Sequence, residues 1–263
     1  MSNSKQQRLE AFGKLMDVVE ELREKCPWDR KQTNESLRTN TIEEVYELSN
    51  ALQADDIDDI RKELGDVLLH VLFYSKIADE QDRFDIADVC DSLRGKLIFR
   101  HPHIYGEVKA DDAHTVEQNW EQIKLKEKNG NKSVLDGVPK ALPSLIKAER
   151  IQEKVANYGF DWEKKEDVWA KVKEELSEFE HELLSGEDAD RSAEFGDLLF
   201  SLVNVARLYK INADDALEHT NRKFVSRFNH IETAARERGA DLRKMTLPEM
   251  DALWNEAKLS EQK

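Results

Sequence analysis

Five acidic residues in the first half of the chain recur in the second half, each displaced by the same interval. The first set is Glu43, Glu44, Glu47, Glu63 and Asp66, and the second set is Glu174, Glu175, Glu178, Glu194 and Asp197. The interval is 131 positions throughout (174 − 43 and 197 − 66). Two sets in register indicate an internal repeat, and carboxylate oxygens are the donors that a hard divalent cation prefers.

The spacing within each set predicts a hairpin of two antiparallel helices. Paired acids are equidistant from Asp55 in the first set and from Gly186 in the second, and both centres lie in turn-like sequences. Within each helix two acids are three residues apart and share a face. Four like charges that converge in this way repel one another unless a cation relieves them. We predict two metal sites, formed by Glu44, Glu47, Glu63 and Asp66, and by Glu175, Glu178, Glu194 and Asp197.

An all-oxygen ligand set favours Mg²⁺, Mn²⁺ or Ca²⁺ over zinc and copper. Mg²⁺ commonly takes a few carboxylates together with substrate phosphates, so the pattern indicates a nucleotide–metal site. Solvated acidic faces and a di-iron bundle are the two alternative interpretations. The di-iron bundle is disfavoured because it needs Glu-x-x-His on two helices. Only Glu178 with His181 fits, since Asn50 stands at the matching place in the first set.

Basic residues follow each acidic set at helical spacing. In the second half Lys223 and Arg227 are four residues apart, with Asn221 beside them, which suits a clamp for phosphate oxygens. The first half repeats the pair as Lys96 and Arg100, but an arginine replaces the asparagine. Ordinary surface charge is the alternative interpretation of either pair.

A tryptophan stands in a short loop before each acidic hairpin, Trp28 in the first half and Trp162 in the second. Trp162 is a candidate for stacking on a nucleotide base, and the alternative is that it anchors its loop to the core. The sequence contains no glycine-rich phosphate loop, nucleophile elbow or Cys/His pairing. Phosphate would therefore be held by metal and side chains.

Helical periodicity runs through nearly the whole chain, which predicts an all-α fold. After the opening helix, helices are expected over 56–79, 85–99, 116–126, 145–156, 168–184, 189–209 and 213–236. Thr41 and Glu44 fit a capping box, so the first acidic helix is expected to begin there.

The helix that follows the turn of each hairpin is apolar on nearly every face, over 67–78 and 198–209. Such helices must be buried on all sides, which a single hairpin cannot provide. We therefore expect four-helix cores that are completed by a second copy of the domain. Gly65 and Gly196 inside these helices suggest the close approach of a neighbouring backbone or of the metal.

The composition limits the partners and the setting. A net charge of −15 argues against nucleic acid or an anionic membrane surface as a partner. The two cysteines, Cys26 and Cys90, lack metal-ligand spacing and are typical of a reducing compartment. No segment resembles a signal peptide or is apolar over a membrane-spanning length, so we expect a soluble cytoplasmic protein.

The repeat also predicts the domain organisation. An N-terminal domain is expected over 1–127, a linker rich in glycine and proline over 128–144, and a C-terminal domain over 145–263.

Several motifs together resemble the MazG nucleoside triphosphate pyrophosphohydrolases. They are the doubled EExxE and ExxD with ELGD and EFGD, and the elements CPWD, GFDW, RHPH and NRKFVSRF, in matching order over almost the full length. The resemblance implies a tandem pair of all-α domains, a homodimer, Mg²⁺ dependence with Mn²⁺ as an alternative, and hydrolysis of NTPs and dNTPs to monophosphate and pyrophosphate. It also implies that the predicted carboxylates ligate the metal and that Lys223 and Arg227 contact phosphate. Because the first half departs from the clamp motif, it is expected to be a structural or regulatory copy.

The expected reaction is attack of a metal-activated water on the α-phosphorus, with pyrophosphate as the leaving group. Glu174 or one of the ligand carboxylates would accept the proton. The expected role is nucleotide-pool house-cleaning or stress-related nucleotide control, with a regulatory protein as a further partner. Two alternatives stay open: a pyrophosphatase for a single nucleotide, such as dUTP or a phosphoribosyl nucleotide, and a non-enzymatic helical protein that binds a basic partner.

Overall fold

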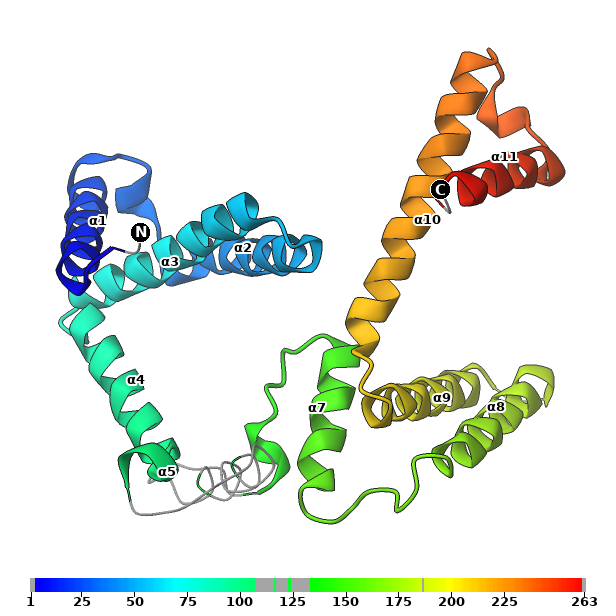
Figure 1. Cartoon of the computed structure of the whole chain (residues 1–263), viewed down its shortest axis with the longest axis horizontal. Helices are drawn as coiled ribbons and strands as arrows, with labels where there is room; N and C mark the ends of the chain where they lie inside the picture. The colour runs from blue at the N-terminus through cyan, green and yellow to red at the C-terminus, as the bar shows by residue number, and fades with distance from the viewer. Residues whose placement is uncertain (1–2, 107–115, 117–122, 124–132, 186, 262–263) are drawn as a thin grey trace. The chain divides into compact units, whose positions relative to one another are not determined.

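The computed structural model describes residues 3–106, 116, 123, 133–185 and 187–261. Within these residues every regular element is a helix, which confirms the predicted all-α class (Figure 1). The chain divides into two compact units, Met1–Ala110 and Asp111–Lys263. No helix in the described ranges combines the length and the apolar character needed to cross a membrane.

Each unit is a succession of helices with short connections. The first unit contains α1 (Lys5–Lys25), η1 (Asp29–Lys31), α2 (Asn34–Ala54), α3 (Ile57–Asp79), α4 (Ile86–Arg100) and α5 (Pro102–Tyr105). The second contains η2 (Leu135–Gly137), α7 (Ser144–Ala156), α8 (Val168–Ser185), α9 (Asp188–Leu208), α10 (Ala213–Glu237), η3 (Leu242–Lys244) and α11 (Leu247–Ser260). The helix expected over 116–126, apart from residues 116 and 123, and the expected boundary at residue 127 lie outside the described residues.

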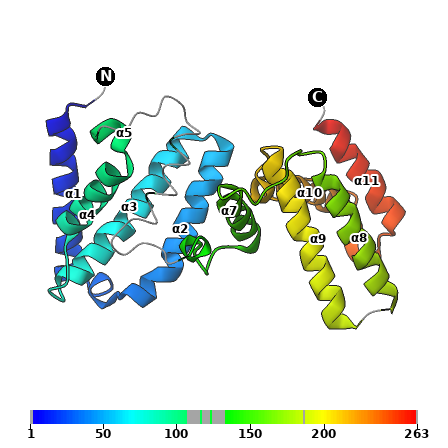
Figure 2. The ribbon, with the colours of Figure 1, turned by 90° about the horizontal axis from the view of Figure 1, so that it is seen from below.

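Both predicted hairpins are present. Helix α2 packs against α3, and α8 packs against α9, so each pair lies side by side (Figures 1 and 2). In the first hairpin the turn falls at Asp55, which ends α2 in the left-handed conformation with φ of 53°. Asp56 then caps α3 by accepting hydrogen bonds from the backbone N–H groups of Asp58 and Asp59. Gly186, the predicted centre of the second turn, lies outside the described residues.

The predicted start of the first acidic helix at Thr41 is wrong. Helix α2 begins at Asn34, where Thr33 and Ser36 form a reciprocal capping box with hydrogen bonds of 3.1 and 2.9 Å. Thr41 lies inside the helix, and its hydroxyl donates to the carbonyl oxygen of Leu37. The pattern Thr-x-x-Glu recurs inside helices, so spacing alone did not separate a cap from an interior threonine.

The core of the first unit lies where α1, α2 and α3 meet. Its buried side chains are Val19, Leu37, Leu72, Phe73 and Ile77. Three helices contribute, which explains why α1 is needed to cover the apolar segment of α3 that a two-helix hairpin would leave open.

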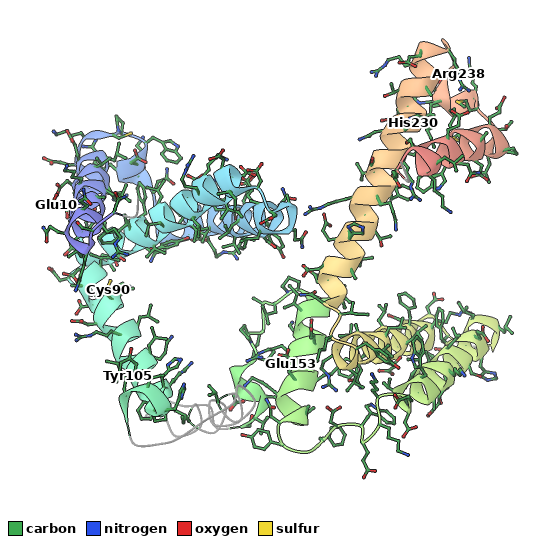
Figure 3. All side chains as sticks on the ribbon, viewed as in Figure 1. Glu10, Cys90, Tyr105, Glu153, His230 and Arg238 are labelled. Carbon is green, nitrogen blue, oxygen red and sulfur yellow. The ribbon has the colours of Figure 1, made fainter. Side chains whose placement is uncertain are left out.

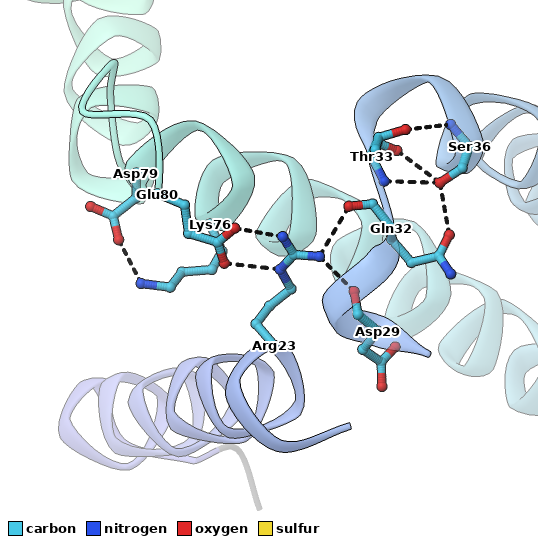
Figure 4. A network of polar contacts seen from close by, with 8 residues as sticks. All are labelled: Arg23, Asp29, Gln32, Thr33, Ser36, Lys76, Asp79 and Glu80. Atoms are coloured by element: carbon cyan, nitrogen blue, oxygen red, sulfur yellow. Dashed lines mark hydrogen bonds and ion pairs between the residues drawn. The ribbon is translucent and has the colours of Figure 1, made fainter. Parts of the chain in front are cut away.

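A buried arginine fixes the loop that connects α1 to α2 (Figure 4). The guanidinium of Arg23 donates to the carbonyl oxygens of Asp29 and Gln32 at 2.5 and 3.0 Å, and to both carboxylate oxygens of Glu80 at 2.9 and 2.5 Å. The hydrogen bonds between Arg23 and the Glu80 carboxylate lower the pKa of Glu80. One side chain on α1 thereby ties the loop before α2 to the end of α3.

Arg23→Met is expected to lower the free energy of unfolding by about 2 kcal/mol, since two carbonyl oxygens lose their donor. The folded pKa of Glu80 is depressed, so its contribution is present above the unfolded pKa and is lost as pH falls through the folded pKa. The difference in Tm between the wild type and Arg23→Met should therefore be largest at pH 7 and become smaller below about pH 4. Thermal melts at both pH values test this. The control is Lys25→Met, which removes only an exposed pair with Glu21; an equal loss there would contradict the role of the network.

The second unit is built around the α8–α9 hairpin. Val168 and Val172 of α8 pack with Leu198 and Val205 of α9. Helix α7 contacts α9, and α10 contacts both α7 and α9 before α11 folds back along it (Figure 1).

Helix α11 was not predicted from the sequence. It is anchored on α10 by Leu253, which is fully buried. Near the end of α10, His230 and Arg238, both labelled in Figure 3, face Glu256 of α11 at 4.0 and 3.7 Å. The capping box of Thr246 and Glu249 at its start is the sequence signal that was available.

The helices α3 and α9 are not buried on all sides within one chain. On α9 the side chains of Phe195, Leu199, Phe200 and Leu202 are each about two-fifths exposed or more. A Cβ atom built at Gly65 or Gly196 would meet nothing within 4 Å, so the close approach predicted at these glycines is not made by the described part of the same chain. The predicted burial of these helices on all sides is therefore not met within the described part of one chain.

Candidate active site

Each acidic hairpin brings three carboxylates together from two helices. In the second unit Glu175 of α8 and Glu194 and Asp197 of α9 each offer an oxygen within 4.8 Å of the others. In the first unit the corresponding side chains of α2 and α3 also have carboxylate oxygens within 4.8 Å of one another. They are Glu44, Glu63 and Asp66. The helix that follows the turn supplies two acids, and the helix before it supplies one.

Glu47 and Glu178, the other two predicted ligands, lie beside these groups but are not members of them. The charge of Glu63 is the largest cause that raises the pKa of Glu47. After burial, the charge of Glu178 is the largest cause that raises the pKa of Glu194. Both side chains are therefore close enough to interact with the groups of three.

Burial and crowding make both groups electrostatically unfavourable when they are fully ionised. Burial, followed by the charges of Asp66 and Glu47, raises the pKa of Glu44. Glu63 is only 2% exposed, and its Oε2 atom has no hydrogen-bond partner among the described residues. A buried carboxylate oxygen without a partner costs stability. An oxygen-only donor set with this unmet demand fits a hard divalent cation.

A lysine contacts each group. In the second unit Lys171 binds Glu175 at 2.6 Å and Glu174 at 3.0 Å. Glu174, the predicted candidate for the proton acceptor, thus pairs with this lysine and stays outside the group of three. In the first unit Lys62 binds Glu63 at 2.5 Å. These two lysines are not related by the repeat, so each unit offsets part of its negative charge in its own way.

A cavity of about 550 Å³ opens beside the carboxylates of the second unit. Glu175 and Asp197 belong both to the group of three and to the wall of this cavity. The remaining wall is mixed: it includes aromatic side chains, aliphatic side chains, the charged side chains of Asp161, Lys171 and Arg207, and the amides of Gln152 and Asn204. The volume lies within the range of about 300–1,000 Å³ that is typical of small-molecule sites.

The loop that carries Trp162 is fixed to the hairpin by an ion pair. Arg207 of α9 donates to the two carboxylate oxygens of Asp161 at 3.0 and 2.5 Å, and this contact lowers the pKa of Asp161. The backbone N–H of Trp162 donates to the same carboxylate at 2.9 Å. Trp162, a predicted stacking residue, therefore lies at the cavity. Arg207 was missed, because no local pattern links it to a loop 46 residues earlier.

The equivalent positions of the first unit have different side chains. Counting back by 131, Ser201 corresponds to His70 and Asn204 to Phe73. Phe73 is part of the core, and buried His70 contacts the hydroxyl of Thr41 at 3.0 Å. Burial lowers the pKa of His70. The two units share their carboxylates but not the polar lining next to them.

The predicted phosphate clamp lies on α10 and has other partners in this structure. Arg227 donates to Glu261 at 2.7 and 3.1 Å and lies over the ring of Trp254. Lys223 contributes to lowering the pKa of Glu261, and Asn221 donates to Glu218 at 3.4 Å.

In the described residues the contacts of Arg227 and Lys223 with a carboxylate are with Glu261 at the end of α11 and not with the carboxylate group of α8 and α9. The first-unit pair, Lys96 and Arg100, lies on α4.

A helical hairpin that gathers carboxylates beside a cavity of small-molecule size is an arrangement suited to an enzyme that uses a divalent cation. The chain belongs to the family of the MazG nucleotide pyrophosphohydrolase domain, a family of enzymes, whose model matches residues 32–105 and 163–232. Both matched segments contain an acidic hairpin, so the predicted tandem repeat and family resemblance are confirmed.

The relatives agree with this assignment. The chain is similar to the nucleoside triphosphate pyrophosphohydrolase of Escherichia coli strain K12, with 38% identity over 95% of this chain and 98% of that protein. It is 41% identical to the nucleoside triphosphate pyrophosphohydrolase/pyrophosphatase MazG of Thermotoga maritima, over 94% and 95% of the two chains. It is also 47% identical to the uncharacterized protein YabN of Bacillus subtilis. That match covers 96% of this chain and 52% of YabN.

Mg²⁺ is expected to raise the Tm of the metal-free protein, because a ligand at about 100 times its Kd stabilises the native state by about 2.7 kcal/mol. Glu194→Gln should raise the Tm in EDTA, since it removes a charge whose ionisation the fold disfavours, and should weaken the response to Mg²⁺. Differential scanning fluorimetry during a Mg²⁺ titration measures both effects. Glu180→Gln, an exposed change on α8, is the matched control; an unchanged Mg²⁺ response in Glu194→Gln would contradict a role for Glu194 as a ligand.

Proposed function

We propose that the chain hydrolyses nucleoside and deoxynucleoside triphosphates to the monophosphate and pyrophosphate, with Mg²⁺ as the metal and Mn²⁺ as a substitute. The observation that carries the proposal is that Glu175 and Asp197 line the cavity and also belong to the carboxylate group. A nucleoside in the cavity would thereby present its phosphates to the metal-type site. The relatives named as nucleoside triphosphate pyrophosphohydrolases support the choice of substrate.

In this proposal Glu175, Glu194 and Asp197 hold the metal, with Glu178 as the fourth ligand. A bound divalent cation neutralises phosphate charge and lowers the pKa of a water at the site. The aromatic wall of the cavity binds the nucleoside and excludes water from it. The carboxylates orient the attacking water towards the α-phosphorus, and Glu174 or a ligand carboxylate accepts its proton. The bond between the α-phosphorus and the bridging oxygen breaks, and pyrophosphate leaves.

We propose that the C-terminal domain, 145–263, is the principal catalytic domain and that the N-terminal copy is structural or regulatory. Support comes from the side chains that replace the cavity lining in the first unit, Phe73 for Asn204 and His70 for Ser201. The first carboxylate group can hold a metal, but the first unit lacks the same polar wall for a nucleoside beside that group.

We also propose that two copies form a homodimer through the exposed apolar faces of the hairpins. The exposed side chains of α9 and the open space at Gly196 support this arrangement. In this proposed dimer, α10 of one copy would supply Lys223 and Arg227 as a phosphate clamp to the carboxylates of the other. The expected setting is the cytoplasm, where such an enzyme controls the nucleotide pool.

The test is an assay of pyrophosphate release with the eight common NTPs and dNTPs, with Mg²⁺ and with EDTA. The expected result is release of one pyrophosphate per monophosphate, with Mg²⁺ only. Hydrolysis of a single nucleotide would favour the specialised pyrophosphatase. Binding of a basic protein that persists in EDTA, without hydrolysis of any nucleotide, would favour the regulatory protein. Sedimentation of the full chain tests the dimer, and a monomer at micromolar concentration would contradict it.

A further inference from the structure

Gln152 of α7 is buried in the wall of the cavity with half of its amide unsatisfied. Its side chain is 4% exposed, and its Nε2 donates to the carbonyl oxygen of Phe200 at 2.9 Å. Its Oε1 is buried and finds no hydrogen-bond partner in the part of the chain that the structure describes. Because a carbonyl oxygen can only accept, the Nε2 contact fixes the orientation of the amide. Oε1 is therefore held as an acceptor that lacks a donor.

Asn204 of α9, in the same wall, has the complementary group to offer. Its Oδ1 accepts two hydrogen bonds from Arg207, at 2.7 and 3.2 Å. A guanidinium has only donors, so these contacts fix the orientation of this amide as well. The Nδ2 group of Asn204 is then left to donate. Gln152 thus contributes one oriented acceptor and Asn204 one oriented donor to a wall that also holds aromatic side chains and the polar groups of Asp161, Lys171, Ser201 and Arg207.

We propose that Gln152 and Asn204 recognise the base of the bound nucleotide, an inference that rests on the proposed function. Each of the four bases carries at least one N–H donor and one acceptor on its Watson–Crick edge. Gln152 Oε1 accepts from the base N–H, and Asn204 Nδ2 donates to the base acceptor. The rings of Phe160, Trp162 and Phe200 supply surface for stacking. The pair identifies a base as opposed to bare phosphate, and it accepts all four bases.

The comparison of repeat-related positions in the two units assigns base recognition to the second unit alone. Phe73 occupies the position of Asn204 in the repeat and has no amide to donate. The first unit can therefore hold a metal with phosphate, but it lacks the donor that identifies a base.

Asn204→Asp is the sharpest test, because it keeps the Oδ1 acceptor for Arg207 and replaces the donor by an acceptor. Binding of α,β-methylene-ATP and α,β-methylene-UTP, which cannot be cleaved at the scissile bond, is measured by calorimetry in Mg²⁺. The Kd is expected to rise about tenfold for both nucleotides. The Kd of tripolyphosphate, which has no base, should stay within about twofold. Asn40→Asp, the same change at an exposed position of α2, should alter neither.

Gln152→Met is the second variant, since methionine preserves the shape but removes the acceptor. It should weaken both nucleotide analogues and leave tripolyphosphate unchanged, even if the Tm falls through the lost contact with Phe200. Equal losses for nucleotides and tripolyphosphate, or no loss, would overturn the base-recognition proposal. A preference of more than about 100-fold between the two wild-type analogues would also overturn it. Because binding needs no turnover, amide-dependent binding without pyrophosphate release would support the base site while refuting the hydrolysis.

Discussion

Asp197→Asn is expected to lower the rate of pyrophosphate release by about 10³-fold or more. The substitution removes the charge of a side chain that lies both in the carboxylate group and in the cavity wall. Asparagine keeps the size of the side chain, so the fold should persist, which circular dichroism and thermal melts check. Initial rates of pyrophosphate release with saturating Mg²⁺ measure the effect on kcat.

The matched control is Asp66→Asn, at the equivalent position of the repeat. It alters a carboxylate group of the same composition. In the first unit, however, the position equivalent to Asn204 of the cavity wall is Phe73, which belongs to the core. We expect a rate within about threefold of the wild type, the scale of a modest change in stability or affinity. Equal losses in the two variants would refute the assignment of catalysis to the second unit.

Arg227→Met is expected to lower kcat/KM by about 10²- to 10³-fold, because a guanidinium that binds phosphate stabilises charge that develops on the leaving pyrophosphate. The same change at Arg100 on α4 should have little effect. The readout is kcat/KM for a nucleotide that the wild type hydrolyses, with the Tm as a check of folding. A rate close to that of the wild type would show that the pairing with Glu261 is the whole role of Arg227.

Mixed dimers decide whether the clamp acts between copies. Asp197→Asn and Arg227→Met are each expected to be strongly impaired, but a dimer with one copy of each contains one complete site if α10 acts on the partner. Activity should therefore return when the two variants are mixed and allowed to exchange. Mixtures that stay inactive, although exchange is demonstrated, would show that each site is built within a single chain.

The hairpins and their carboxylates could be predicted because the information is local and doubled. The distance from Glu44 to Asp66 and the position of Asp55 between them fix which side chains face each other across a short turn. Helical periodicity of 3.6 residues then sets the face. The repeat supplied a second, independent occurrence of the same spacing.

The cavity could not be predicted in the same way. Its wall depends on α7 packing against α9 and on the pair of Arg207 with Asp161, which are 46 residues apart in the chain. Nothing in the sequence near Gln152 distinguishes it from an exposed glutamine on an amphipathic helix. Long-range contacts and burial decide its role, and these follow only from the packed structure.

The clamp shows a different limit. The four-residue spacing of Lys223 and Arg227 predicts that they share a face of the helix, but it could not reveal which acid lies opposite. Helix α11 supplies Glu261, and α11 itself went unpredicted. A charged face on a helix therefore carries too little information to separate a structural ion pair from a ligand site.

The pairing of Arg227 with Glu261 has a consequence for selectivity among anions. Glu261 already satisfies the guanidinium, and its own pKa is lowered by that contact, so it remains an anion under ordinary conditions. A phosphate group that reaches Arg227 has to displace a bound carboxylate. Chloride or a single inorganic phosphate exchanges one weak contact for another and gains little. Under the proposed function, a polyphosphate chain that the metal site anchors at the same time would gain more from opening the pair, so Glu261 would disfavour the binding of single small anions at Arg227.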